Sequence, residues 1–385
     1  MTQNSRIMII AGEASGDKYG AWLTAEIRRR LPSAEFFGMG GDLMRGEGVE
    51  TLVDADDMAV FGLVEILAHA GTIRRAYLLL KKQFKIRRPE LLILIDYQEF
   101  NQLLAAAARK VGIRVLFYIS PQVWAWRPGR VKKMARIVDH MAVLFPFEVP
   151  LYQRVGVPVT FVGHPLLDIV RPTLARDEAF SRFGLDTSRR VVGLFPGSRR
   201  SELKNLFSVI IDSALLLREQ YPDLQFVLPL APSFKREELA PLIRSSGLDV
   251  TIIQGLTYDV MQLCDAVISV SGTVTLELAL MTVPMVIIYR VSPVTYAIGR
   301  RLVKIEHAGI CNIVAGERVV KELIQDEATP AAIAAEIGRI LHDGAYRVAI
   351  REKLAGVRAK LGNGGCSARL AEVAVNMLER RARHD

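Results

Sequence analysis

The hydrophobic pattern of the chain alternates short apolar runs with longer stretches of helical period. Short apolar runs are typical of strands buried in a parallel sheet, and the stretches between them are typical of crossover helices. In the first half the predicted strands are Ile7–Ala11, Glu35–Gly38, Leu91–Ile95, Val115–Ile119, His140–Phe145 and Thr160–Val162. In the second half they are Val191–Phe195, Gln225–Leu230, Val250–Ile253, Ala266–Val270 and Met285–Tyr289.

Each half carries a glycine-containing turn after its first strand, at Gly12–Asp17 and at Pro196–Arg200. The pattern therefore predicts an α/β protein of two Rossmann-like domains with parallel sheets. We place the first domain at residues 1–165 and the second at 166–366, and we expect a final helix, 367–383, to join the first domain. Because ligands of such sheets bind at the carboxyl ends of the strands, we expect a central cleft to hold the site.

Length and composition agree with this prediction. The chain has 385 residues, of which 50% are hydrophobic and 24% charged, a balance typical of an ordered protein of about two domains. The three cysteines, Cys264, Cys311 and Cys366, lie far apart, which excludes a disulfide framework or zinc site and favours a cytoplasmic setting. We find no signal-peptide pattern, and no apolar run approaches the ~18 residues of a membrane span.

The net charge of +9 is concentrated between Arg74 and Arg88, where seven residues are basic and none is acidic. An apolar segment precedes this run, as in an interfacial amphipathic stretch that docks on anionic lipid. The predicted membrane-facing residues are Phe61, Leu63, Val64, Ile66, Leu67, Arg74 and Arg75. A solvated helix face is the plain alternative. Nucleic acid is not expected as a partner, because only Tyr77 and Phe84 lie among the charges.

Two segments of the first half could carry chemistry. Gly12-Glu-Ala-Ser-Gly-Asp17 is neither a dinucleotide fingerprint nor a P-loop, and its acidic Glu13 suits a sugar or hydroxyl better than a pyrophosphate. In this turn, Ser15 or Asp17 can cap the following helix. Asp96 follows the strand Leu91–Ile95, where a general base would stand, although its spacing to Glu99 also matches a helix capping box.

Two further positions in the first half and its linker have residue types that could carry chemistry. Asp54-Ala-Asp56-Asp57 resembles the DxD of metal-dependent sugar transferases, but its surroundings indicate a loop, and we expect no metal site. His164 lies in the predicted linker and, by its position, faces the cleft. It is the one histidine with a candidate functional role.

The second half carries two turns suited to phosphate. Gly197, Ser198 and Arg199 offer backbone N–H groups, a hydroxyl and a guanidinium at a helix N-terminus. A second turn, Ser271-Gly272-Thr273, offers similar donors, and Glu277 lies about one helical turn further, where it can accept from ribose hydroxyls. Two such turns in one domain indicate a nucleoside diphosphate.

These motifs together resemble the lipid-A-disaccharide synthase family. The blocks that carry the resemblance are Gly12–Asp17, Ser120-Pro-Gln-Val-Trp-Ala-Trp-Arg127, Gly163-His-Pro165, Pro196–Arg199, Ser271–Thr273 with Glu277, and Asn312 with Glu322-Leu-Ile-Gln325. The resemblance implies an inverting, metal-independent GT-B glycosyltransferase without a cofactor. It implies transfer of a sugar from UDP-2,3-diacylglucosamine to 2,3-diacylglucosamine 1-phosphate, which yields UDP and a β-1,6 disaccharide.

The resemblance also implies roles for the residues. Asp96 is expected to be the base and Arg199 to stabilise the departing diphosphate, while Glu13, Ser15 and Asn101 bind the acceptor or sugar. The UDP side is expected to comprise Gly197, Ser198, Arg199, Ser271, Gly272, Thr273, Glu277, Asn312, Glu322 and Gln325. The first domain would face the acceptor and the inner leaflet of the cytoplasmic membrane, and a homodimer is compatible with this expectation.

The sequence departs from the family pattern at two places. Where the family usually reads Asp-x-Pro-Asp-Phe-Asn, this chain has Gln98 and Glu99 in place of the proline and the second aspartate, and Cys311 replaces a proline that often precedes Asn312. The rival enzyme functions are an undecaprenyl-linked glucosaminyltransferase and a UDP-sugar 2-epimerase, which lack the Ser120–Arg127 block. A basic peripheral membrane- or RNA-binding protein is the non-enzymatic rival.

Overall fold

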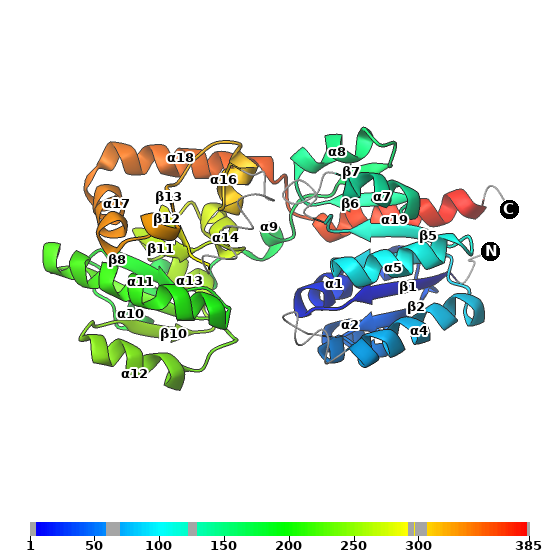
Figure 1. The fold of residues 1–385 in the computed structure, drawn as a ribbon, viewed down its shortest axis with the longest axis horizontal. Coiled ribbons are helices and arrows are strands. Elements are labelled where there is room, and N and C mark those ends of the chain that lie inside the picture. The colour runs from blue at the N-terminus through cyan, green and yellow to red at the C-terminus, as the bar shows by residue number, and fades with distance from the viewer. Residues whose placement is uncertain (1–4, 59–69, 122–128, 292–295, 297–305, 383–385) are drawn as a thin grey trace. The chain divides into compact units, whose positions relative to one another are not determined.

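The computed structural model describes residues 5–58, 70–121, 129–291, 296 and 306–382. The chain divides into two compact units, Met1–Asp168 with Asn363–Asp385, and Ile169–Gly362 (Figure 1). Each unit has one sheet, and all paired strands run parallel. The prediction of an α/β fold with two parallel sheets is therefore confirmed.

The first unit has a seven-stranded sheet of order β3-β2-β1-β4-β5-β6-β7. The strands are β1 (Arg6–Ala11), β2 (Glu35–Gly40), β3 (Glu50–Asp54), β4 (Leu91–Ile95), β5 (Arg114–Tyr118), β6 (His140–Val143) and β7 (Val159–Phe161). The helices are α1 (Ala14–Arg30), α2 (Asp42–Gly46), η1 (Asp56–Met58), α4 (Ala70–Ile86), α5 (Gln98–Arg109), α7 (Arg130–Ile137), η2 (Pro146–Glu148), α8 (Val149–Gln153), α9 (Leu166–Ile169), which ends at the boundary of the unit, and α19 (Cys366–Ala382).

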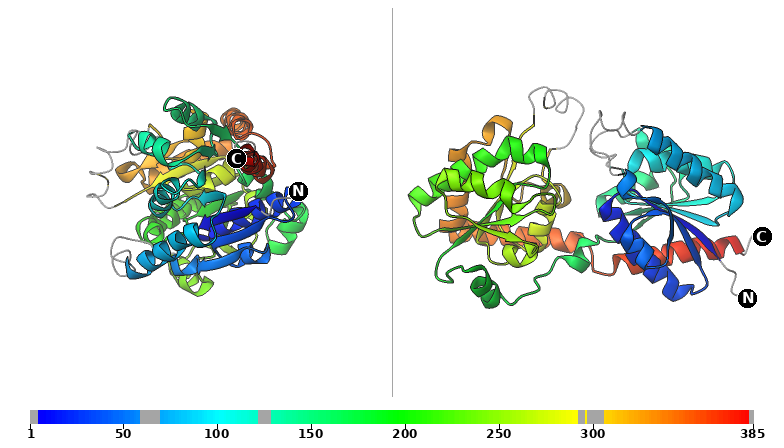
Figure 2. Two further views of the ribbon diagram at one scale, coloured as in Figure 1. Left: turned by 90° about the vertical axis from the view of Figure 1, so that its right-hand side faces the viewer. Right: turned by 90° about the horizontal axis from the view of Figure 1, so that it is seen from below.

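Alternation along β1 explains why helices cover both faces of this sheet. Ile7 and Ile9 pack in one core cluster with residues of α1 and α19. Met8 and Ile10 point the other way and pack with residues of α4, α5 and α7. Since successive side chains of a strand face opposite sides, an all-apolar strand needs a cover on each side. Figure 2 shows α1 and α19 on one side of the sheet and α4 on the other.

The second unit has a six-stranded sheet of order β10-β9-β8-β11-β12-β13. The strands are β8 (Val191–Phe195), β9 (Gln225–Leu230), β10 (Thr251–Gln254), β11 (Ala266–Val270), β12 (Met285–Tyr289) and β13 (Glu322–Ile324). The helices are α10 (Arg176–Phe183), α11 (Arg200–Gln220), α12 (Arg236–Ser246), α13 (Thr257–Met261), α14 (Val274–Leu280), α16 (Ile310–Ala315), η3 (Gln325–Glu327), α17 (Pro330–His342) and α18 (Gly344–Lys360).

Two edge strands were missed by the sequence prediction. The segment around Asp54, interpreted as a loop, is strand β3, and Glu322 opens strand β13. Both lie at an edge of their sheet, where one side of the strand has no partner. Strand β3 is only partly buried and β13 has three residues, so neither shows the long apolar run that marks the central strands.

The topology places the candidate turns next to one another within each sheet. In the first unit, the strand order reverses between β1 and β4, whose carboxyl ends lead to Gly12 and Asp96. In the second unit, it reverses between β8 and β11, which lead to Pro196 and Ser271. Such switch points are where open α/β sheets bind their ligands.

Candidate active site

The turn after β4 has an unusual backbone. Asp96 and Tyr97 both have left-handed conformations, with φ of 48° and 42°, although neither is a glycine. Helix α5 starts at Gln98 with Tyr97 at the N-cap and no side-chain cap hydrogen bond. The capping-box alternative for Asp96 and Glu99 is therefore wrong. Glu99 is exposed and pairs with Arg130 at 2.9 Å.

The Asp96 carboxylate is thus available for chemistry. It is partly buried and accepts a hydrogen bond from Gln98 Nε2 at 3.0 Å. Burial raises the pKa of Asp96 above the ordinary value of its carboxyl group, and the donors on Gln98 and the Tyr97 backbone oppose that rise. A carboxylate whose pKa is raised is a stronger base than one in open water.

Asn101 lies beneath this turn and binds its backbone. It is fully buried, and its Nδ2 donates to the Ile95 carbonyl at 3.2 Å and to the Asp96 carbonyl at 2.7 Å. The Asn101 side chain has no exposed surface and holds the turn, and its expected contact with a sugar stays a prediction. The signal for this role was its place in the first turn of α5.

The turn after β1 packs against the turn after β4. A Cβ at Gly12 would lie 2.6 Å from the Tyr97 ring, so a glycine is required there. Glu13 stands at the N-cap of α1 and is partly buried, and Ser15 is exposed. Burial and, next, the Glu13 carboxylate raise the pKa of Tyr97. Glu13 and Tyr97 therefore lie close together, beside Asp96.

Asp17 has a different role from the predicted cap of its own helix. It is buried, and its carboxylate accepts backbone N–H groups of Gly41, Leu43 and Met44 at 2.7–3.1 Å. Asp17 therefore caps α2, which holds the loop after β2 against α1.

His164 also has a structural role. It is buried, its Nδ1 accepts from the Leu166 backbone at 3.2 Å, and burial lowers its pKa to about 4.

The first phosphate-type turn of the second unit is already filled by a side chain that the sequence prediction missed. Gly197 has a φ of 90°, and Arg199 occupies the N-cap of α11. Glu202 Oε2 accepts the backbone N–H groups of Ser198 and Arg199, each at 3.1 Å. Its Oε1 pairs with the Arg199 guanidinium at 2.9 Å. A glutamate three residues after a helix N-cap is the pattern that could have revealed it.

The second turn has free space around its glycine. A Cβ at Gly272 would have no neighbour within 4 Å, and Thr273 is exposed. The Ser271 hydroxyl donates to the Ala308 carbonyl at 2.9 Å. Glu277 accepts a hydrogen bond from the Tyr258 hydroxyl at 3.0 Å and is partly buried. Tyr258 was not predicted, since it lies 19 residues before Glu277 in the chain.

Three residues expected on the UDP side bind neighbouring loops, and two of them, Asn312 and Glu322, are buried. Asn312 is fully buried and its Nδ2 donates to Glu322 Oε1 at 2.8 Å, while Glu322 also accepts the backbone N–H groups of Ala308 and Gly309. Gln325 exchanges two hydrogen bonds with the backbone of Val291. These hydrogen bonds give the three side chains a supporting role in the structure, and their contact with a nucleotide stays a prediction. Cys311, beside Asn312, is also fully buried, and burial raises its pKa to about 12.

Some predicted residues lie outside the described ranges. These are the apolar membrane-facing set, Phe61, Leu63, Val64, Ile66 and Leu67, and the motif residues from Gln122 to Arg127. Within the described ranges, no three His, Cys, Asp or Glu side chains are grouped to hold a metal ion. Asp54 accepts from Arg45 at 2.8 Å and from the Asp56 backbone at 2.9 Å.

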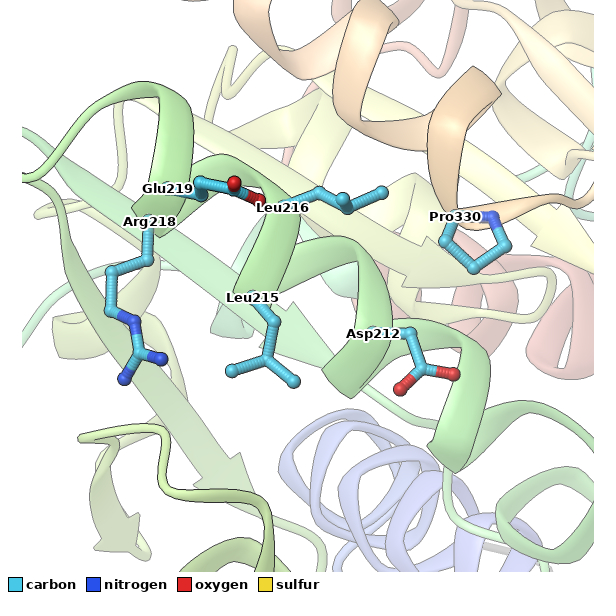
Figure 3. A pocket seen from close by; sticks show the side chains of 6 residues that line it. All are labelled: Asp212, Leu215, Leu216, Arg218, Glu219 and Pro330. Carbon is cyan, nitrogen blue, oxygen red and sulfur yellow. The ribbon is translucent and has the colours of Figure 1, made fainter.

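A surface pocket of the second unit is separate from these turns. It lies along the later part of α11 and is lined by Asp212, Leu215, Leu216, Arg218, Glu219 and Pro330 (Figure 3). At ~1.5 Å per helical residue, Asp212 is roughly 20 Å along the helix from Arg199. The pocket therefore does not belong to the candidate site.

Comparison with known proteins was made by sequence and by structure. Residues 7–373 match the family model described as lipid-A-disaccharide synthetase. The chain is 63% identical over 380 residues to the lipid-A-disaccharide synthase of Geobacter sulfurreducens, covering 98% of this chain and 99% of that protein. It is 46% identical to the lipid-A-disaccharide synthase of Nitrosococcus oceani, covering 97% and 96%.

Solved structures with low sequence identity share the fold. The UDP-GlcNAc 2-epimerase of Neisseria meningitidis, solved with UDP-GlcNAc, matches with a TM-score of 0.65 at 14% identity, covering 96% of this chain and 100% of that one. The calicheamicin glycosyltransferase CalG4 matches with a TM-score of 0.59 at 15% identity and 99% coverage of both chains. At this level of identity the likeness concerns the fold alone, so it does not favour the epimerase function.

Proposed function

The chain belongs to the lipid-A-disaccharide synthase family of glycosyltransferases, which acts in lipid A biosynthesis, and from this premise we propose how its residues carry out the reaction. The donor is UDP-2,3-diacylglucosamine and the acceptor is 2,3-diacylglucosamine 1-phosphate. The acceptor 6-hydroxyl oxygen forms a bond to the anomeric carbon of the donor, and the bond from that carbon to the UDP diphosphate breaks. A single displacement of this kind inverts the anomeric carbon and gives the β-1,6 disaccharide.

Asp96 is the proposed base that takes the hydroxyl proton. The observation that carries this proposal is its partly buried carboxylate at the switch point of the first sheet, free of a capping role and with a raised pKa. Glu13 and Ser15, on the adjacent turn, are proposed to bind the acceptor or sugar. Glu99 takes no part, because it is exposed and paired with Arg130.

The second unit is the proposed UDP side. Arg199 and the N–H groups of the Gly197–Arg199 turn bind the diphosphate, and charged donors of this kind stabilise the leaving group without a metal ion. Ser271, Gly272 and Thr273 form the second phosphate turn. Glu277, oriented by Tyr258, accepts from the ribose hydroxyls. The buried Asn312 and Glu322 and the partly buried Gln325 support the loops around these turns.

A face of helix α4 supports docking on the inner leaflet of the cytoplasmic membrane. Its exposed residues are Arg74, Arg75, Leu78, Leu79, Lys81, Lys82, Lys85 and Ile86. Exposed aliphatic side chains among cations can insert between acyl chains while the charges meet anionic headgroups. The two aromatic residues weighed for nucleic acid, Phe84 and Tyr77, pack in or against the core, so they are not placed to stack on bases. Among the described helices, none is long and apolar enough to cross a bilayer.

The reaction is tested by following UDP release from UDP-2,3-diacylglucosamine with and without the monosaccharide 1-phosphate, in the presence of EDTA. We expect release only with the acceptor, at a rate that EDTA does not change, and β configuration at the new bond. Arg199→Ala is expected to weaken UDP binding by about 1.5–3 kcal/mol, the range for a hydrogen bond to a charged group. Loss of the activity in EDTA would contradict metal independence. A homodimer stays a prediction of the family resemblance.

A further inference from the structure

The Gln98 side chain lies between the turns that follow β4 and β5. Its Nε2 is 3.0 Å from Asp96 Oδ1 and 3.4 Å from the Ile119 carbonyl oxygen. A carbonyl oxygen only accepts hydrogen bonds, so the NH₂ end of the amide must face this side, whatever the protonation state of Asp96. The amide therefore presents a fixed N–H donor to the Asp96 carboxylate.

The other end of the Gln98 amide strengthens this argument. Gln98 Oε1 is buried and has no hydrogen-bond partner among the described residues. A buried acceptor without a partner is unfavourable, so this orientation persists because of the contacts that Nε2 makes. The contacts of the Nε2 donor, and not any contact of Oε1, therefore hold the Gln98 side chain in place.

The left-handed backbone in the turns after β4 and β5 needs side-chain contacts to hold it. Asp96, Tyr97 and Ile119 have φ of 48°, 42° and 69°, a left-handed region that is uncommon for residues other than glycine and an outlier for β-branched isoleucine. Such conformations persist only where neighbouring groups fix them, and they cluster at functional sites. Asn101 binds the backbone carbonyls of the β4 turn, while Gln98 binds the Asp96 carboxylate itself and links it to the β5 turn.

We propose that Gln98 is a positioning residue for Asp96, whose amide N–H aims the carboxylate and stabilises its ionised form. This inference rests on the proposed role of Asp96 as the base. A donor to the charged form favours ionisation, which counteracts the effect of burial. Gln98 therefore keeps the base deprotonated at a pH at which burial alone would protonate it.

Other charged groups around Asp96 do not account for this effect. Glu99 is exposed and paired with Arg130. Glu13, on the turn after β1, acts on the Tyr97 hydroxyl, which itself donates to the Met58 carbonyl at 3.1 Å. Both residues are acidic, so neither supplies a positive charge that would stabilise the ionised Asp96 carboxylate. Among the described side chains, the recorded donor to that carboxylate is Gln98.

The test is the pH dependence of kcat/KM in Gln98→Met, which keeps the unbranched side chain and removes the donor. Without that donor, we expect the acidic limb of the profile to move up by about one pH unit. This corresponds to about a tenfold loss of activity on that limb, with UDP affinity unchanged. Gln98→Glu, which keeps the side-chain length, is expected to move the limb in the same direction because two neighbouring carboxylates raise each other's pKa.

Glu99→Gln is the matched control, since it alters the next residue in an exposed position that has no contact with Asp96. We expect its acidic limb to stay at the wild-type pH. An unmoved limb in both Gln98 variants, with Asp96→Asn inactive, overturns the inference and leaves the base role intact. Equal shifts in the Glu99 control overturn it as well. If Asp96→Asn is fully active, the proposed base fails first and the inference fails with it.

Discussion

Glu202 places one carboxylate oxygen 3.1 Å from the backbone nitrogen of Arg199 and the other 2.9 Å from its guanidinium. The donors that would bind a diphosphate are therefore occupied by an anion of the protein itself. The Glu202 side chain is 11% exposed, whereas that of Arg199 is 71% exposed. Because the Arg199 side chain is exposed, its ion pair with Glu202 contributes little stability and can open when a stronger anion arrives.

Glu202→Gln tests whether this carboxylate competes with the diphosphate. The amide has no charge to repel phosphate, so we expect UDP to bind about fivefold more tightly, or ~1 kcal/mol, in isothermal titration calorimetry. Uridine, which lacks phosphate, is expected to bind equally to both proteins. Weaker UDP binding in the variant would instead mean that Glu202 keeps the Gly197–Arg199 turn in its binding shape.

Asp96→Asn separates catalysis from folding. Removal of a general base is expected to lower kcat by about 10²–10⁴-fold, with UDP affinity unchanged. Burial raises the pKa of Asp96 in the folded protein, so its ionisation destabilises the fold as the pH rises through the ordinary carboxyl range. The variant is therefore expected to unfold at a higher temperature than the wild type at pH 7, and this gain is expected to shrink toward pH 3. A catalytically normal variant would eliminate Asp96 as the base.

Membrane docking is tested on the described part of the predicted surface. Leu78→Ser combined with Leu79→Ser removes two exposed apolar side chains of α4 and is not expected to disturb the core. We expect reduced sedimentation with anionic vesicles. Wild-type binding is expected to weaken with salt, because the Debye length falls from ~10 Å at 0.1 M to ~3 Å at 1 M.

The control for that experiment is Leu242→Ser on α12 of the second unit. Leu242 is 50% exposed and Leu78 is 51% exposed, so Leu242→Ser removes about as much apolar surface as Leu78→Ser, one of the two changes in the α4 double variant. Binding that is equal in the α4 double variant and the control would indicate that the α4 face is only solvated.

His164 predicts a pH dependence of stability. Burial lowers its pKa from 6.5 to about 4, so the unfolded chain takes up a proton between these values that the folded protein does not. Stability is therefore lost as the pH falls from 6.5 toward 4, by up to about 3 kcal/mol from this group. In urea titrations at pH 7 and pH 4.5, we expect His164→Asn to lose less stability than the wild type. Equal losses would show that other groups set the acid sensitivity.

The sequence predicted the central strands and the turns that follow them, because fully buried strands such as β4 leave an uninterrupted apolar run. Side-chain direction was harder to predict. Asn101, Asn312 and Glu322 have the residue types that bind sugars or nucleotides, yet their polar atoms point to the backbone of neighbouring loops. A motif gives the residue and its spacing but not which way the side chain turns.

The backbone conformation of the turn after β4 was also hard to predict from the sequence. Asp96 and Glu99 have capping-box spacing, and that interpretation fails because two successive residues are left-handed before α5 begins. Neither residue is a glycine, so the sequence holds no local signal for this conformation. The contacts that fix it, a local one from Asn101 to Asp96 and a tertiary one from Tyr97 to Met58, become visible only in the fold.

Helix α19 affects the order in which the two units can fold during synthesis. The second unit is one continuous segment, Ile169–Gly362, whereas the first is completed by residues made after it. Until α19 has left the ribosome, one face of the first sheet, with Ile7 and Ile9, lacks the apolar cover that Leu370 and Ala374 supply. The first unit can thus be completed only after the second unit has been synthesised. All seven strands of its sheet are made before the second unit, so the face that α19 covers is apolar surface that favours aggregation until the helix packs.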